Sequence, residues 1–240
     1  MKTSASSTKE VELESASKNS LSKKFLKGTN NMAKLIAFGE ILIDWIPLEK
    51  KQEGQLSLPI YGQYPGGAPC NVAVAAAQLG AEAHFLGKTG EDAFGSFLRH
   101  SLDDFAVKTD YLLDDPAPTP MAFVSLDDDG ERSFAVHRTN SADLQYKATD
   151  YPEELFEGEG IFHICSNTLT DESIRQTTWD GLELAEKKGF LKSVDVNIRF
   201  PLWNKLDELR PAVLHTMEQS DLIKLSKEEL QYLANAQNEE

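Results

Sequence analysis

The sequence is poor in cysteine. Only two of its 240 residues are cysteines, and Cys70 and Cys165 have neither the number nor the spacing of a disulfide framework or a zinc site. Both lie in apolar surroundings, which is typical of small core residues. We therefore expect a protein of a reducing compartment, the cytoplasm.

Basic residues are also in the minority. The chain has 24 lysines and arginines against 39 aspartates and glutamates, which gives a net charge of −15. Nucleic acids and anionic membranes are poor partners for such a chain, because binding their phosphates needs a basic surplus. A small anionic ligand is not excluded, since only the pocket that binds it must be positive.

A long apolar segment is missing as well. No run approaches the length that spans a bilayer, and the N-terminus has no hydrophobic segment of the kind found in secretory signals. Residues 1–31 are rich in Ser, Lys, Glu and Thr and are predicted to be a disordered extension. A transit peptide is the alternative, but Glu10, Glu12 and Glu14 argue against it. We expect the folded domain to comprise residues 32–240.

Within that domain, short apolar runs alternate with longer segments that have helical character. Alternating strands and helices are typical of an α/β domain with a mostly parallel central sheet flanked by helices. The segments near 47–64 and 119–138 are expected to add a small β lid. The predicted strands are 35–38, 41–46, 83–87, 121–126, 132–137, 160–166, 191–196 and 221–225, and the predicted helices are 71–79, 92–105, 171–188, 206–219 (interrupted early by Pro211) and one that Ser226 opens.

Two adjacent glycines, Gly66 and Gly67, precede a small apolar segment that is predicted to be a buried helix ending at Gly80. Glycine lets the backbone adopt positive φ and approach a ligand closely. Asn71 is then expected near the first turn of the helix, where backbone N–H groups lack partners. This place suits the hydroxyl groups of a small polar ligand, although a glycine turn before an ordinary core helix is the alternative.

Further polar residues occur within or directly after predicted strands. Asp44 lies in an apolar segment, where a carboxylate is costly to bury unless it is hydrogen-bonded. It is either an acceptor for ligand hydroxyls or a satisfied structural carboxylate. Asp195, Asn197 and Arg199 alternate at the carboxyl end of a strand, which is the edge of an α/β sheet where ligands bind.

The stretch Gly66-Gly67-Ala68-Pro69-x-Asn71-x-Ala73, followed by Gly80 and Gly90, resembles the first signature of the ribokinase-like (PfkB) sugar kinases. Its surroundings resemble the fructokinase branch of that family in particular. Other matching blocks follow in the family's order between residues 34 and 233. They are residues 39–44, 87–95, 129–134, 141–144 and 195–203.

The resemblance implies a ribokinase-like fold and an enzyme that phosphorylates fructose, with ATP and Mg²⁺ as cofactors and a homodimer formed through the lid. Other PfkB sugar kinases, such as 2-keto-3-deoxygluconate kinases, and a non-catalytic sugar-binding module are the alternatives. The implied sugar-binding residues are Asp44, Gly66, Gly67, Asn71, Arg138 and Arg199. The implied ATP-binding residues are Arg132, Asn197 and Lys224, and Glu229 is expected to help position Mg²⁺ indirectly.

Two departures from the family pattern stand out. Ser226 replaces the Asn of an Asn-x-x-Glu element, and Ser226 with Glu229 is equally explained as a helix capping box. The family's Gly-Ala-Gly-Asp element, which supplies the anion hole and the catalytic base, is not found. We therefore expect this sequence to correspond to the N-terminal two-thirds of such a kinase, with the base beyond Glu240.

Overall fold

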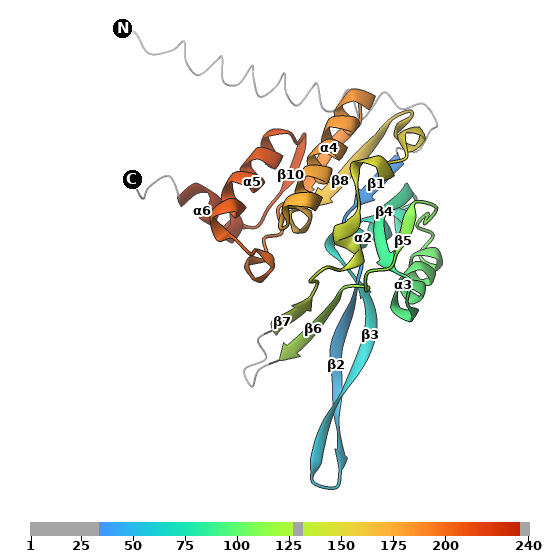
Figure 1. The fold of residues 1–240 in the computed structure, drawn as a ribbon, viewed down its shortest axis with the longest axis vertical. Helices are drawn as coiled ribbons and strands as arrows, with labels where there is room; N and C mark the ends of the chain where they lie inside the picture. The colour runs from blue at the N-terminus through green and yellow to red at the C-terminus, as the bar shows by residue number, and fades with distance from the viewer. Residues whose placement is uncertain (1–33, 127–131, 236–240) are drawn as a thin grey trace. The chain divides into compact units, whose positions relative to one another are not determined.

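The computed structural model describes residues 34–126 and 132–235 (Figure 1). The extension expected at residues 1–31 and the segment between the predicted strands 121–126 and 132–137 lie outside the described residues. Everything below therefore concerns the two described ranges.

A six-stranded sheet forms the centre, in the order β10-β9-β8-β1-β4-β5. Every neighbouring pair in it is parallel, so the carboxyl ends of all its strands meet at one edge. This confirms the α/β architecture predicted from the sequence. The strands are β1 (Lys34–Phe38), β4 (Glu82–Gly90), β5 (Leu112–Asp115), β8 (Gly160–Cys165), β9 (Leu191–Asp195) and β10 (Leu222–Lys224).

Helices cover both faces of this sheet, which explains why residues 35–38 of the central strand β1 are all apolar and buried. In β1, Ile36 and Phe38 belong to the same buried cluster as Leu182 of α4. The intervening Ala37 belongs to a second cluster, with Ala73 of α2. The helices are α2 (Ala68–Gln78), α3 (Ala93–Asp104), α4 (Glu172–Lys188), α5 (Leu206–Glu218) and α6 (Lys227–Asn235), with short 3₁₀ helices at Ala142–Gln145, Ala148–Asp150, Glu153–Phe156, Ser166–Leu169 and Phe200–Leu202.

A second, four-stranded sheet has the order β3-β2-β6-β7 and is called the lid below. Its strands are β2 (Leu42–Glu53), β3 (Leu56–Gly66), β6 (Met121–Leu126) and β7 (Arg132–His137). The chain passes from β1 into β2 almost directly, and the β2–β3 hairpin extends away from the six-stranded sheet (Figure 1). Because β2 and β6 run parallel while the outer pairs are antiparallel, both lid hairpins start from the same side.

Two local features differ from the sequence-based expectation. Strand β5 was not predicted, since its four residues are half acidic and give no strand pattern. Pro211 lies inside α5 and does not end it. A proline removes one backbone donor, but Leu209 and Val213 on either side are buried and hold this helix against its neighbours.

Candidate functional site

A cavity of about 820 Å³ lies between the lid and the carboxyl ends of the central strands. The lid contributes its inner face, the start of α2 contributes a wall, and the segments that follow β1, β8 and β9 contribute the rest. Its lining residues are Glu40, Leu42, Asp44, Gly67, Ala68, Asn71, Val72, Ala75, Ala122, Val136, Arg138, Asn167, Asp195, Asn197, Arg199, Pro201 and Leu202.

The two glycines before α2 are required by the geometry of this wall. Gly67 has a φ of +113°, and a Cβ there would lie 2.3 Å from the backbone oxygen of Glu40. A Cβ on Gly66 would lie 2.1 Å from Oδ2 of Asp44. Asn71 donates its backbone N–H to the oxygen of Gly67 at 3.0 Å, which places its side chain on the first turn of α2, at the cavity. Gly66 packs behind Asp44 and does not itself line the cavity.

Asp44 enters the cavity from β2. Burial raises the pKa of its carboxyl above the ordinary value of 3.8, since a charged group loses hydration when it leaves water. Ala122 is its neighbour on β6 and lines the same cavity. Asp44 is thus a partly desolvated hydrogen-bond acceptor on the lid face.

Arg138 is 6% exposed and lies just after β7. Its Nε donates to Asp143 at 2.5 Å, and its Nη1 donates to the backbone oxygen of Asn167 at 2.8 Å and to Thr170 at 3.1 Å. Burial alone would lower the pKa of Arg138, but the charges of Asp143 and Glu40 and the hydrogen bond to Asp143 together outweigh it and raise the pKa. Its Nη2 has no hydrogen-bond partner among the described residues, so both N–H groups of this nitrogen are left unpaired in the cavity wall.

Sequence reasoning missed Glu40 and Asn167 as site residues. Glu40 is 1% exposed and accepts hydrogen bonds through Oε1 from the backbone N–H of Ala68 at 3.0 Å and from Nδ2 of Asn167 at 2.9 Å. Because a carboxylate only accepts, this contact fixes the orientation of the Asn167 amide. Oδ1 of Asn167 then has no partner among the described residues. Their positions in the sequence could have identified them, since each residue lies two positions after the end of a central strand.

The segment after β9 supplies the opposite wall. Asn197 adopts a φ of +34°, and Asn197 and Arg199 both line the cavity, as does Asp195. Lys224 does not line it. Its Nζ pairs with Asp195 at 2.8 Å while its side chain stays 73% exposed. Asp195, Asn197 and Arg199 therefore all line the cavity. Lys224 lies behind them, in contact with Asp195.

Glu229 lies outside the lining residues and holds this wall from behind. Its Oε1 accepts the backbone N–H of Ile198 at 2.8 Å and its Oε2 accepts that of Ser226 at 2.7 Å. Ser226 Oγ accepts the backbone N–H of Glu229 at 3.2 Å, which completes a capping box. The roles of Glu229 at Mg²⁺ and of Arg132 at ATP stay predictions. The backbone of Arg132 lies on β7, and its side chain is outside those the structure describes.

Within the described ranges, no group of three or more His, Cys, Asp and Glu side chains is arranged to hold a metal ion. No helix in the same ranges has the length and apolar character that crossing a membrane requires.

Comparison with known proteins gives consistent results. The sequence profile of the pfkB family carbohydrate kinases matches residues 32–240. A probable chloroplastic fructokinase-6 of Arabidopsis thaliana is 38% identical over 208 residues, which cover 85% of this chain and 53% of that protein. Fructokinase-1 of Zea mays is 38% identical over 200 residues, covering 83% of this chain and 62% of its own length.

Solved structures agree with this assignment. A fructokinase from Xylella fastidiosa superimposes with a TM-score of 0.81 at 38% identity, covering 85% of this chain and 63% of that one. A double-mutant fructokinase from Vibrio cholerae O395, described with bound fructose, ADP and potassium ion, gives a TM-score of 0.75 at 32% identity. It covers 87% of this chain and 64% of that one. The chain thus spans between about half and two-thirds of the length of these relatives.

Proposed function

This chain belongs to the pfkB family of carbohydrate kinases, as its glycine signature indicated, and on that premise we propose that the protein phosphorylates fructose with ATP as the phosphate donor. The observation that carries the proposal is the cavity itself, in which Asp44, Asn71, Arg138 and Asn167 converge on one space. Support for fructose comes from the relatives, which are named fructokinases.

The sugar end of the proposed site is the part next to the lid and the start of α2. Sugar hydroxyls both donate and accept hydrogen bonds. Asp44 and Oδ1 of Asn167 would accept from them, while Nη2 of Arg138 and the amide of Asn71 would donate. Gly67 lets the sugar approach the backbone, and Gly66 leaves room for the Asp44 carboxylate.

The charge balance of this end favours a neutral sugar. Glu40 and Asp44 are both carboxylates in the cavity lining, and the charge of Arg138 is already paired with Asp143 at 2.5 Å. An acid sugar such as 2-keto-3-deoxygluconate would bring a further negative charge, which these carboxylates repel. We therefore favour fructose over that alternative.

The phosphate end is proposed to lie at the segment that follows β9. Arg199 would contact the transferring phosphate, because a guanidinium matches phosphate oxygens in geometry and charge. Asn197, Lys224 and, from β7, Arg132 would contact ATP. ATP would arrive as its Mg²⁺ complex, and the metal would neutralise phosphate charge. Glu229 would act indirectly, since its carboxylate holds the backbone of Ile198 next to Asn197 and Arg199.

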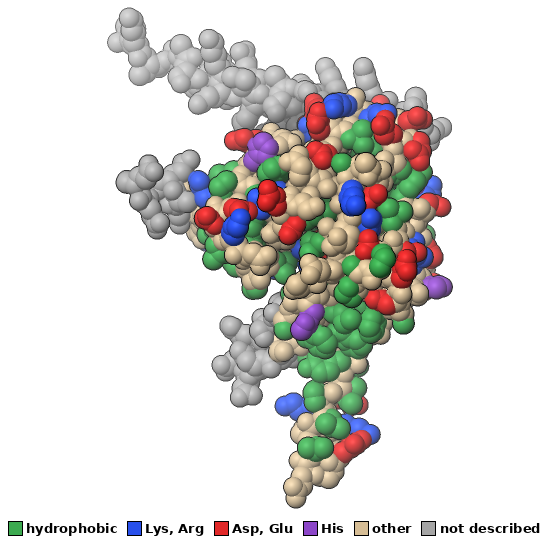
Figure 2. All heavy atoms as spheres, in the orientation of Figure 1, with side chains coloured by type: hydrophobic (Ala, Val, Ile, Leu, Met, Phe, Trp, Pro, Cys, Tyr) green, Lys and Arg blue, Asp and Glu red, His purple; other side chains and the backbone are tan. Residues whose placement is uncertain are grey.

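We also propose that two copies associate through the lid. Leu48, Leu56 and Ile60 of the β2–β3 hairpin are 57%, 62% and 36% exposed, and hydrophobic side chains gather on the visible face of the lid (Figure 2). Exposed apolar patches of this kind mark interaction surfaces. Sedimentation analysis should give a dimer that Leu48→Lys with Leu56→Lys dissociates, and a monomeric parent protein would refute this part.

The test of function is calorimetric binding of fructose, ribose, glucose and 2-keto-3-deoxygluconate without ATP, followed by phosphorylation assays with ATP and Mg²⁺. Fructose should bind in preference to the others, and a protein that includes the family's Gly-Ala-Gly-Asp element should phosphorylate it. Binding of fructose without turnover by such a protein would indicate a sugar-binding module instead. Preference for another of these sugars would make that sugar the proposed substrate and leave the family unchanged. A chain that binds none of them would contradict the proposal.

A further inference from the structure

The first turn of α3 makes several hydrogen bonds with the chain segment that enters the lid. Asp92, which caps this helix, accepts hydrogen bonds through Oδ1 from the backbone N–H of Gly95 at 2.8 Å and from the hydroxyl of Thr119 at 2.8 Å. Its Oδ2 accepts the backbone N–H of Thr119 at 3.0 Å. A cap needs only the first of these contacts, so the other two serve to hold Thr119.

Thr119 is 2% exposed and lies two residues before β6 begins. Besides donating to Asp92, its Oγ1 accepts the backbone N–H of Gly90 at 3.0 Å. The next residue, Pro120, accepts the backbone N–H of Ile43 at 3.1 Å, which joins the chain to β2. The hydroxyl of Thr119 therefore ties the end of β4 and the start of α3 to the point where β6 enters the lid.

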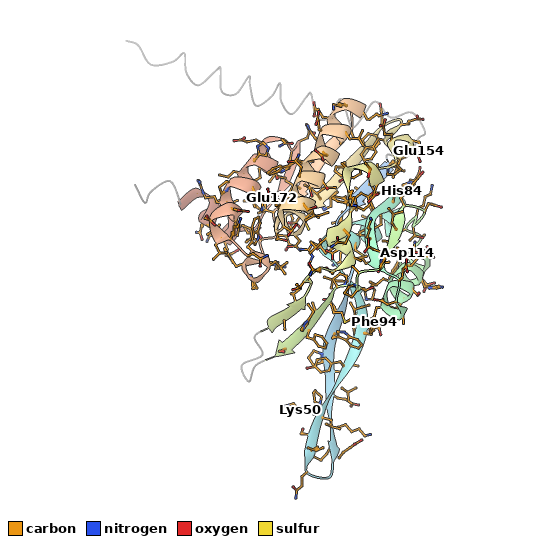
Figure 3. The ribbon with its side chains drawn as sticks, viewed as in Figure 1. Lys50, His84, Phe94, Asp114, Glu154 and Glu172 are labelled. Atoms are coloured by element: carbon orange, nitrogen blue, oxygen red, sulfur yellow. The ribbon has the colours of Figure 1, made fainter. Side chains whose placement is uncertain are left out.

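A second contact from the same turn reaches the lid itself. The ring of Phe94 meets the ring of Trp45 edge-on, with centroids 6.0 Å apart, and Figure 3 labels Phe94 where α3 approaches the lid strands. Trp45 in turn stacks on Phe123 of β6 at 5.9 Å. Since successive side chains of a strand point to opposite faces, this aromatic contact lies directly behind Asp44, on the face of the lid away from the cavity.

The packing leaves this turn little freedom. A Cβ on Gly95 would lie 2.1 Å from the backbone oxygen of Gly90, and a Cβ on Gly90 would lie 2.6 Å from both Thr119 N and Asp92 Oδ2. Close packing of backbone on backbone allows one relative position of β4, α3 and the segment before β6. Burial would raise the pKa of Asp92, but hydrogen bonds from Thr119 and Gly95 outweigh it, and the pKa is lowered.

From these contacts we infer that Asp92, Phe94 and Thr119 form a lid anchor. The anchor is a set of positioning residues that hold β2 and β6 in a fixed position over the cavity. Because Asp44 lies on β2, these residues set the affinity of the cavity for sugar. The part that concerns sugar rests on the proposed function. None of the three residues lines the cavity, so the effect must be transmitted through the lid strands.

The matched pair Thr119→Val and Thr119→Ser tests the anchor. Valine has the shape of threonine without the hydroxyl, whereas serine keeps the hydroxyl. Thr178→Val is the control, because Thr178 is also buried and its hydroxyl bonds the backbone oxygens of Ile174 and Thr168, neither of which belongs to the lid. Hydrogen exchange of the β2 and β6 amides, the calorimetric dissociation constants for fructose and for ATP, and the thermal midpoint are measured for each variant.

Thr119→Val should speed exchange in β2 and β6 and raise the dissociation constant for fructose by about threefold to tenfold, with that for ATP within about twofold. Thr119→Ser should restore both, and Thr178→Val should lower the thermal midpoint without either effect. If Thr119→Val does not fold, Phe94→Leu replaces it, with the same expectations.

Two results would overturn the inference. Unchanged exchange in β2 and β6 would show that Thr119 does not anchor the lid. Faster exchange with a dissociation constant for fructose equal to that of Thr178→Val would show that the anchor does not set affinity, while the proposed function would stand. If the parent protein binds no sugar, the proposed function fails, and the exchange data alone decide whether the anchor exists.

Discussion

The carboxylate of Glu40 accepts a hydrogen bond from the side-chain amide of Asn167 at 2.9 Å, although 127 residues separate them in the chain. Glu40 follows β1 and Asn167 follows β8, and these strands are neighbours in the sheet. The contact decides which end of the Asn167 amide is left for a ligand. With one N–H of Nδ2 held by Glu40, Oδ1 is the acceptor that has no partner among the described residues.

The first prediction concerns Asn167. Asn167→Ala removes this acceptor, and we expect fructose affinity to fall about tenfold, as for loss of one hydrogen bond in a desolvated site. Asn167→Asp should instead lower the thermal midpoint, because it brings two carboxylates within hydrogen-bond distance and only one can ionise readily. Calorimetry and thermal melting check these outcomes against the control Thr178→Val. An Asn167→Ala protein with parental fructose affinity would remove Asn167 from the sugar site.

A second prediction separates the charge of Glu40 from its hydrogen bonds. Both strong contacts of Glu40 go to one oxygen, Oε1, and the partner of Oε2 is the weakly donating thiol of Cys165 at 3.5 Å. Glutamine retains a single acceptor oxygen, so Glu40→Gln should change the free energy of unfolding by less than about 1 kcal/mol. Glu40→Leu leaves the N–H of Ala68 and Nδ2 of Asn167 without an acceptor and should cost about 2–6 kcal/mol. Urea unfolding of the two variants measures the difference. Equal losses would mean that the negative charge itself is needed.

Most of the fold could be predicted from the sequence, because local sequence patterns mark most of its helices and strands. The short apolar run that contains Ile36 and Phe38 can only be a strand buried on both faces, and the residues around Gly67 have a signature whose glycines the geometry explains. The element that was missed, β5, is short and half acidic. It forms because Leu112 and its neighbours pair with β4, which no local pattern records.

The site could be predicted only in part, because contacts between distant segments leave no local pattern. Asp44 and Asn71 belong to recognisable motifs, whereas the role of Asn167 depends on Glu40, and that pairing exists only once β1 and β8 are adjacent. Lys224 shows the opposite case. The family resemblance implied an ATP-binding role for it, which stays a prediction, while in the structure it pairs with Asp195 and does not line the cavity.

The third prediction concerns the pH dependence of sugar binding. Burial raises the pKa of Asp44 above the ordinary 3.8, and only the ionised form accepts hydrogen bonds through both oxygens. Fructose affinity should therefore decline on acidification at a higher pH than an ordinary aspartate would give. Asp44→Asn should bind about 10- to 100-fold more weakly at pH 7 and should lose this decline. Calorimetry from pH 4 to pH 8 provides the comparison. An identical pH profile in the variant would assign the titration to another group.

The last prediction concerns His163, which is 6% exposed on β8 and lies 3.0 Å through Nδ1 from the hydroxyl of Ser193. Burial lowers the pKa of His163 from 6.5 to about 4; the charge of Asp195 opposes the shift and that of Lys224 adds to it. Because the folded pKa lies below the unfolded one, the unfolded chain binds more protons between these values, and stability is lost as the pH falls through this window.

The loss attributable to His163 is at most about 3 kcal/mol between pH 6.5 and pH 4. Urea unfolding at a series of pH values should show it in the parent protein. His163→Gln keeps a polar side chain that does not titrate, so its unfolding free energy should be flatter over this range. His100→Gln, at an exposed position of α3, is the matched control and should keep the parental slope. If His163→Gln also keeps that slope, His163 is protonated in the folded protein. Its burial beside Ser193 then does not prevent it from becoming charged.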